Sequence, residues 1–330
     1  MKRLLIIFIT FSLLVFSGCE RAAADSKGGQ TAGRTDHTAD AENVSADRDA
    51  DGAPTETADK KHSSEGKNVS GSQEADKSSE AQIDPSSLPN TMFYWWFKRN
   101  ENHAAPEAQQ EIDLTKYDAW YVKPEVKDGE KPVFLTFDCG YENGYTPGIL
   151  DVLQKHRAPA AFFVCKHFIE DQPDLIRRMK EEGHVVGNHT ANHICMPEND
   201  DRTVREEIAE NADYMKEATG YEMDPFFRPP KGEYSERTLQ ITKNMGYTTI
   251  FWSLAYVDYD VNSQPGADYV INQFDQYIHP GAIPLIHNIS ESNAQALDTV
   301  LTNLENAGYT FCSLYELSDT AATGNNGSSD

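Results

Sequence analysis

From residue 132 onward, short apolar runs rich in β-branched and aromatic residues alternate with segments whose apolar residues recur at helical spacing. The runs predict strands at Val133–Phe137, Ala160–Cys165, His184–Gly187, Pro225–Arg228, Tyr247–Trp252, Ala282–Ile286 and Tyr309–Ser313. The helical patterns lie near Gly148–His156, Pro173–Glu182, Thr203–Thr219, Ser235–Met245, Ala267–Tyr277 and Ser292–Asn306. Alternation of this kind is typical of right-handed crossovers between parallel strands. We therefore predict an α/β fold, and this many units can close into a barrel.

The first 19 residues have the pattern of an export signal. Lys2 and Arg3 precede a largely apolar run that ends at Phe16, and small residues follow before Cys19. The run is shorter than the roughly 17 to 25 residues that a membrane-spanning helix needs. Its end resembles the lipobox of bacterial lipoproteins, with Phe16 where leucine is usual, so Cys19 would carry a lipid. An ordinary secretory signal and an uncleaved anchor are the alternatives. All three predict a chain outside the cytoplasm, and lipidation would hold it on the outer face of the cell membrane, facing the cell wall.

The sequence between this signal and the alternating region divides into two parts. Residues 20–87 contain almost no large apolar side chains, so we expect a disordered acidic tether. Residues 88–130 are aromatic, with Trp95, Trp96 and Phe97, and we expect an extension that packs on the barrel; sugar binding is the alternative. The folded domain is then 131–318, and 319–330 is predicted to be a disordered tail.

Charge and cysteine content narrow the partners. The formal net charge is −24, and the clustered Lys and Arg that nucleic acid requires are missing. A neutral glycan is compatible with this charge, and we expect a monomer. Beyond Cys19 there are four cysteines, which allow up to two disulfides in pairings that the sequence does not choose: Cys139, Cys165, Cys195 and Cys312. Cys165 and Cys312 lie in apolar runs and are predicted to be buried thiols.

Reactive side chains follow the predicted strands, which is where α/β barrels place their chemistry. Those side chains are Asp138, His189, Arg228, Asp258 and His287. His189 and His193 are four residues apart, so that on a helical turn both could bind one metal, although this spacing is also common on ordinary helices. Asp138 could be a general base or a turn residue, and His287 a general acid or an ordinary histidine at the barrel rim. The turn Arg228-Pro-Pro-Lys231-Gly is rigid, and the Lys231 N–H could donate to an oxyanion.

These segments, in this order, resemble the five motifs of the polysaccharide deacetylase family, also called the NodB-homology domain or carbohydrate esterase family 4. The resemblance spans residues 136–287 and implies a deformed (β/α) barrel, usually of seven strands, in a metal-dependent hydrolase of N-acetyl groups. It implies roles for the residues as follows: Asp138 as base, His189 and His193 as metal ligands, His287 as acid, Arg228 as the partner of Asp138, and Asp258 as the anion that keeps His287 protonated. It also implies that the Lys231 N–H binds the oxyanion, and that Leu285 and Trp252 line a pocket for the acetyl methyl group.

A narrower resemblance is to the delta-lactam-biosynthetic de-N-acetylases. It rests on Phe137–Pro147, on Trp95-Trp96-Phe97 and on Phe251-Trp252-Ser253 with Val257-Asp258. Those proteins act on N-acetylmuramic acid stripped of its peptide, so the expected partner is a peptidoglycan glycan strand. A deacetylase of N-acetylglucosamine or of another polysaccharide is the alternative. An inactive glycan-binding lipoprotein is the alternative from another class, although a lectin has no use for a matched acid and base.

Cys139 departs from the family pattern, which has an aspartate there as the third metal ligand. The Cys139 thiolate could bind zinc beside His189 and His193. Cys139 could instead form a disulfide with Cys195, or the metal could have only the two histidines. The expected cofactor is a divalent metal, zinc in the first place, with a ligand set that the sequence leaves open.

Overall fold

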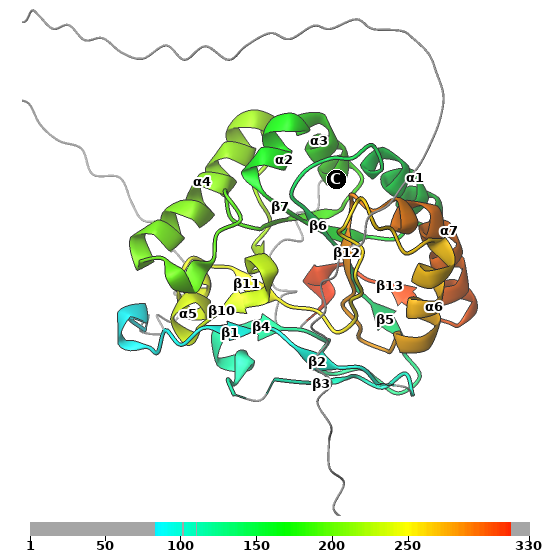
Figure 1. Cartoon of the computed structure of the whole chain (residues 1–330), viewed down its shortest axis with the longest axis horizontal. Helices are drawn as coiled ribbons and strands as arrows, with labels where there is room; N and C mark the ends of the chain where they lie inside the picture. Colours follow the sequence, from blue (N-terminus) through cyan, green and yellow to red (C-terminus); the bar gives the residue numbers. More distant parts are fainter. Residues whose placement is uncertain (1–82, 101, 110, 318–330) are drawn as a thin grey trace, which may run out of the picture. The chain divides into compact units, whose positions relative to one another are not determined.

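The computed structural model describes residues 83–100, 102–109 and 111–317 (Figure 1). The predicted signal peptide with Cys19, most of the tether and the tail at 319–330 lie outside the described residues. Of the helices described, none has the length and apolar character to cross a bilayer. Ile83 to Ser87 were predicted to end the tether, but Pro85–Ser87 form a 3-10 turn, η1, capped by the Asp84 side chain. The main chain is anchored here because Asn244 donates to the Ile83 carbonyl (2.9 Å).

Seven parallel strands form the central sheet, as predicted. Their order is β12 (Leu285–His287), β6 (Leu135–Cys139), β7 (Ala160–Val164), β8 (Val185–Asn188), β9 (Phe226–Phe227), β11 (Thr248–Ile250) and β4 (Ala119–Trp120). The sheet curls. An isolated bridge joins Val122, which follows the edge strand β4, to Ala282, which precedes the other edge strand, β12. This is the deformed barrel that the motif resemblance implied.

One of the seven strands differs from the prediction. Tyr309–Ser313 was expected in the sheet, but β13 (Thr310–Phe311) pairs instead with β5 (Pro132–Val133) in a separate two-stranded sheet. The chain leaves β5 at Phe134, whose N–H donates to the Ala282 carbonyl (2.9 Å). The edge position is taken by β4, parallel to β11, within the segment that was expected only to pack on the barrel.

Helices cover the outer face of the sheet (Figure 1). They are α1 (Thr146–His156), α2 (Lys166–Asp171), α3 (Pro173–Glu181), α4 (Asp201–Thr219), α5 (Glu236–Asn244), α6 (Ala267–Tyr277) and α7 (Glu291–Asn306). All but the short α2 correspond to predicted helices. Strand β6 shows how the layers are made: Leu135, Phe137 and Cys139 belong to the large apolar cluster shared with the helices. The alternate residues Thr136 and Asp138 point to the opposite face, the interior of the barrel.

Apolar side chains also fill the interior of the barrel. Phe134, Phe163 and Ile250 form a second buried cluster that includes Leu314 of η5 (Leu314–Glu316). Gly187 of β8 allows this packing, since a Cβ there would lie 2.8 Å from both the Phe163 ring and the Phe226 carbonyl oxygen. The plugged interior leaves the carboxyl ends of the strands as the place where a site can form.

The segment before the barrel contributes strands to two small antiparallel pairs and forms a 3-10 turn. Strand β1 (Phe93–Tyr94) pairs with β10 (Glu233–Tyr234), β2 (Phe97–Lys98) pairs with β3 (Glu107–Ala108), and η2 (Leu114–Tyr117) leads into β4. The Trp95 ring stacks on Phe251 with centroids 4.5 Å apart, and its Nε1–H donates to the Trp252 carbonyl (2.9 Å). This segment therefore supports the chain that follows β11.

Candidate active site

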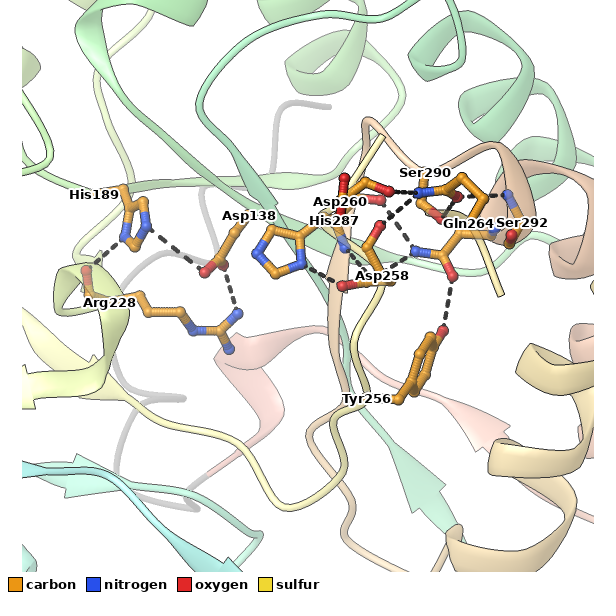
Figure 2. Close-up of polar contacts among 11 residues, drawn as sticks. Asp138, His189, Arg228, Tyr256, Asp258, Asp260, Gln264, His287, Ser290 and Ser292 are labelled. Carbon is orange, nitrogen blue, oxygen red and sulfur yellow. Dashed lines mark hydrogen bonds and ion pairs between the residues drawn. The ribbon is translucent and has the colours of Figure 1, made fainter. Parts of the chain in front are cut away.

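Two neighbouring strands bring the predicted base and the predicted acid together. Asp138 on β6 and His287 on β12 are register partners, and registered residues of parallel strands project from the same face. Figure 2 shows the two side chains turned toward each other at this edge. Asp138 is the penultimate residue of β6 and His287 the last residue of β12, so both side chains lie at the carboxyl edge of the sheet.

Arg228 fixes the Asp138 carboxylate. The guanidinium is fully buried, and it donates to Asp138 Oδ1 (2.7 Å) and to Thr136 Oγ1 (2.8 Å). Burial alone would raise the pKa of Asp138, but the charge of the adjacent Arg228 outweighs it and holds the pKa below its usual value. Asp138 is therefore an anion with one oxygen committed to Arg228. Its other oxygen lies 3.6 Å from His189 Nε2.

His189 and His193 converge as predicted, but not on a helix. Their ring centroids are 4.9 Å apart, and both Thr190 (φ 62°) and His193 itself (φ 54°) have left-handed backbone. Helix α4 holds this loop, since the Ala191 N–H donates to the Glu207 carbonyl (3.1 Å) and the Asn192 N–H to Glu207 Oε2 (2.8 Å). The convergence therefore depends on a tertiary contact that residue spacing does not reveal.

The surroundings of both histidines favour the neutral imidazole, the form in which histidine can bind a metal. His189 Nδ1 donates to the Arg228 carbonyl oxygen (2.8 Å), which directs the lone pair of Nε2 toward Asp138 and the cavity. Burial lowers the pKa of His189, and burial together with the neighbouring His189 ring lowers the pKa of His193 to about 4. Two neutral imidazoles suit zinc. The described residues contain no group of three or more His, Cys, Asp or Glu side chains that could hold a metal ion.

Cys139 lies away from this pair. Its side chain is fully buried in the apolar cluster between sheet and helices, and burial raises the pKa of its thiol well above the ordinary value. The residue next to Asp138 on a strand faces the opposite side, which explains its direction. Cys139 is also a free cysteine, as is Cys195, so the disulfide between them is absent. Of the three outcomes that the sequence left open, the disulfide with Cys195 is not formed in this structure, and the Cys139 thiol lies in the apolar cluster.

Asp258 is placed to hold His287 protonated. Its Oδ1 accepts from His287 Nδ1 (2.6 Å) and its Oδ2 from the His287 main-chain N–H (2.9 Å). Burial would lower the pKa of His287, but the hydrogen bond and charge of Asp258, with the charge of Asp138, raise it above the ordinary value. His287 can therefore present a proton from Nε2 to the cavity.

Two residues that the sequence analysis missed hold Asp258 in place. Asn293, in the first turn of α7, donates from Nδ2 to Asp258 Oδ2 (2.7 Å), and its Oδ1 accepts from the Tyr256 hydroxyl (2.9 Å). Gln264 donates to the Asp258 carbonyl (3.0 Å) and accepts from the Ser290 hydroxyl (2.7 Å). Figure 2 shows Tyr256, Gln264 and Ser290 of this network together with Asp258. No local motif marks Asn293, because it looks like an ordinary residue of a helix start.

Asp138, His189, His193 and His287 line a cavity of about 960 Å³. Leu285 and Trp252 line it, as does Lys231, which has a left-handed backbone (φ 57°) in the turn η4 (Pro230–Gly232). The cavity also reaches two exposed rings, Tyr141 and Tyr259. The structure thus brings every predicted site residue of the described chain to one place except Cys139, and Cys165 lines the cavity instead.

Comparisons with known proteins agree with this site. The family model described as polysaccharide deacetylase matches residues 125–250. The peptidoglycan-N-acetylmuramic acid deacetylase PdaA of Bacillus subtilis is 44% identical over 70% of this chain and 87% of its own length. The chain therefore belongs to the polysaccharide deacetylase family, whose members are hydrolases of acetylated glycans.

Solved structures support the same assignment. The structure of Bacillus subtilis PdaA, a family 4 carbohydrate esterase, matches with a TM-score of 0.66 at 44% identity, over 70% of this chain and 98% of that one. A family 4 carbohydrate esterase from Bacillus anthracis matches with a TM-score of 0.57 at 39% identity, over 70% of this chain and 98% of that one. A peptidoglycan-N-acetylglucosamine deacetylase of Bacillus cereus is more distant, 30% identical over 63% of this chain and 96% of its own length.

Proposed function

We propose that this chain removes the acetyl group from N-acetylmuramic acid residues of peptidoglycan glycan strands. The observation that carries the proposal is the registered pair of an anionic Asp138 and a protonated His287 at the mouth of one cavity. The muramic specificity rests on the similarity to PdaA and on the motifs shared with the delta-lactam-biosynthetic group. We further propose that the chain acts outside the cytoplasm as a monomer, held to the membrane by a lipid on Cys19.

The side chains divide the reaction between them. Asp138 accepts a proton from the attacking water, whose oxygen adds to the acetyl carbonyl carbon, and the Lys231 N–H stabilises the oxyanion that develops. His287 then donates its proton to the nitrogen as the carbon–nitrogen bond breaks, which releases acetate and the free amine. Leu285 and Trp252 bind the acetyl methyl group.

His189 and His193 would hold a divalent metal, zinc in the first place. When bound, the metal would polarise the acetyl carbonyl as a Lewis acid. The buried Cys139 thiol takes no part in this assignment. Arg228 has two tasks in it, because its side chain orients Asp138 while its main-chain carbonyl orients His189.

The test uses glycan strands freed of stem peptide by an amidase. The purified chain is incubated with them in zinc and, separately, in chelator, and acetyl loss is assigned to each sugar by mass spectrometry. We expect loss on muramic residues that chelator abolishes and that Asp138→Asn lowers at least about 10³-fold, with the exposed Asp128→Asn as matched control. Loss confined to glucosamine would replace the proposed substrate. Loss on no sugar, with Asp138→Asn like wild type, would favour a glycan-binding protein.

A further inference from the structure

The histidine loop, residues 189–193, has a backbone shape that its residues do not adopt by preference. Thr190 (φ 62°) and His193 (φ 54°) are left-handed, which is unfavourable for a residue with a Cβ and most of all for a β-branched one. A backbone of this kind persists where the surrounding structure determines it. The groups that fix this loop therefore also fix how closely the two imidazoles approach each other.

Helix α4, which packs on this loop, carries an asparagine where its pattern calls for an apolar residue. Val204, Ile208 and Met215 are buried at helical spacing, and Asn211 occupies the remaining place in that row with no exposed surface. A buried amide loses its hydrogen bonds to water, so it is unfavourable unless protein groups replace them. Packing of α4 on the sheet would be served better by an apolar side chain at this position.

The Asn211 amide joins α4 to the carboxyl ends of two strands. Its Nδ2 donates to the Val164 carbonyl of β7 (2.8 Å) and to Asn188 Oδ1 of β8 (3.0 Å). The same Asn188 oxygen accepts the Thr190 N–H (2.9 Å), and Asn188 Nδ2 donates to the Ile208 carbonyl of α4 (2.8 Å). The first left-handed residue of the histidine loop is thus held to α4 through Asn188.

Glu207 holds the other half of the histidine loop. It lies one turn before Asn211 on the same face of α4. Its carboxylate accepts two hydrogen bonds from Asn192, one from the main-chain N–H (2.8 Å) and one from Nδ2 (2.7 Å). Hydrogen bonds to an ionised acceptor are the stronger kind, and two of them restrict the residue that directly precedes His193.

We propose that Glu207 and Asn211 are positioning residues of the metal site, which hold the histidine loop in the shape that brings both imidazoles together before a metal binds. The inference rests on the proposed function, in which His189 and His193 hold the metal. Neither Glu207 nor Asn211 lines the cavity, so both act through the loop. Imidazoles that are already in place lose less conformational entropy on binding, and loss of such outer partners typically costs about 10- to 100-fold in metal affinity.

The hydrogen bonds of Asn211 also show how positioning can be separated from packing. Both of its acceptors have a second donor, since the Val164 carbonyl also accepts the His189 N–H (3.2 Å) and Asn188 Oδ1 keeps the Thr190 N–H. Asn211→Leu therefore leaves neither acceptor without a donor, and it completes the apolar row of α4 with a side chain of the same branched shape. A packing role predicts that zinc affinity and stability fall together in this variant, whereas a positioning role predicts that zinc affinity falls alone.

The experiment measures zinc affinity and stability in the same variants. The purified chain is stripped of metal with chelator and titrated with zinc against an indicator, and its metal-free form is unfolded in urea. We expect Asn211→Leu and Glu207→Ala each to lower zinc affinity about 10- to 100-fold, with the urea midpoint of Asn211→Leu at or above that of wild type. Glu207→Gln keeps an oxygen for the Asn192 N–H and should stay within about threefold of wild type. The exposed Glu206→Ala is the matched control and should bind zinc like wild type.

Two results would overturn the inference while leaving the proposed function in place. Zinc affinities of Asn211→Leu and Glu207→Ala within about threefold of wild type would mean that the histidine loop keeps its shape without these side chains. A urea midpoint of Asn211→Leu that falls together with its zinc affinity, with Glu207→Ala no different from Glu206→Ala, would make Asn211 a packing residue only. Failure of the proposed function has a different signature, because wild type itself would then bind no zinc in the titration.

Discussion

The charge of Asp258 decides the protonation of His287, and this gives a pH signature. His287 acts as an acid, so activity falls as pH rises through its pKa, which lies above the ordinary value of 6.5 in the wild type. Asp258→Asn removes the anion and leaves the burial, which lowers that pKa. We expect the alkaline limb of kcat/KM to move to lower pH, measured on peptide-free glycan from pH 5 to 10. If the alkaline limb of kcat/KM stayed at the same pH in Asp258→Asn, a group other than His287 would be responsible for the loss of activity at high pH.

Cys139 and His193 allow a matched test of the metal ligands. Cys139→Ala removes a thiol that lies in the apolar cluster, so we expect zinc-dependent activity within about threefold of wild type and a stability cost of about 1 kcal/mol. His193→Ala removes one of the two converging imidazoles and should lower zinc affinity at least about 100-fold, measured by titration against a zinc indicator. A large loss of zinc affinity in Cys139→Ala would place the thiol at the metal after all.

At the scale of elements, the first turn of α7 is part of the active site. Asn293 joins Tyr256, Asp258 and the His287 carbonyl through its side chain and is almost fully buried. Asn293→Ala removes one of the two hydrogen bonds to Asp258 Oδ2, so we expect kcat to fall about tenfold or more with KM nearly unchanged, because Asn293 does not line the cavity. Asn303→Ala, near the other end of α7, is the control. A rise in KM without a fall in kcat would mean that Asn293 acts on substrate binding instead.

The elements also show what could be predicted from the sequence. The five-residue strands β6 and β7 are fully buried, and their position between helical patterns predicts both the sheet and the residues at its carboxyl edge. Strand β4 has two residues and no periodicity, so only its pairing with β11 reveals it. The spacing of His189 and His193 suggested convergence on a helical turn, but it does not distinguish such a turn from a loop held by Glu207. Asn293 was missed because its partners are distant in the sequence.

At the scale of the whole molecule, the segment before the barrel is part of the folded unit. It supplies the edge strand β4, and Trp95 stacks on Phe251 beneath Trp252, a wall of the cavity. A boundary at residue 131, drawn from the alternating pattern, therefore separates a strand from its own sheet. The sequence could not show this, because an aromatic segment that packs on a barrel and one that completes it have the same composition.

Adjacent tryptophans test this role. Trp95 is 8% exposed and Trp96 is 48% exposed. Trp95→Ala removes the stack on Phe251 and the hydrogen bond to the Trp252 carbonyl, so we expect a loss of about 3 to 5 kcal/mol in the free energy of unfolding and a higher KM, since Trp252 loses its support. Trp96→Ala should stay within about 0.5 kcal/mol. Urea denaturation of both variants gives the free energies, and glycan kinetics give KM. Equal stability of the two variants would mean that the segment rests on the barrel without supporting it, and that the cavity wall at Trp252 is held from the barrel side alone.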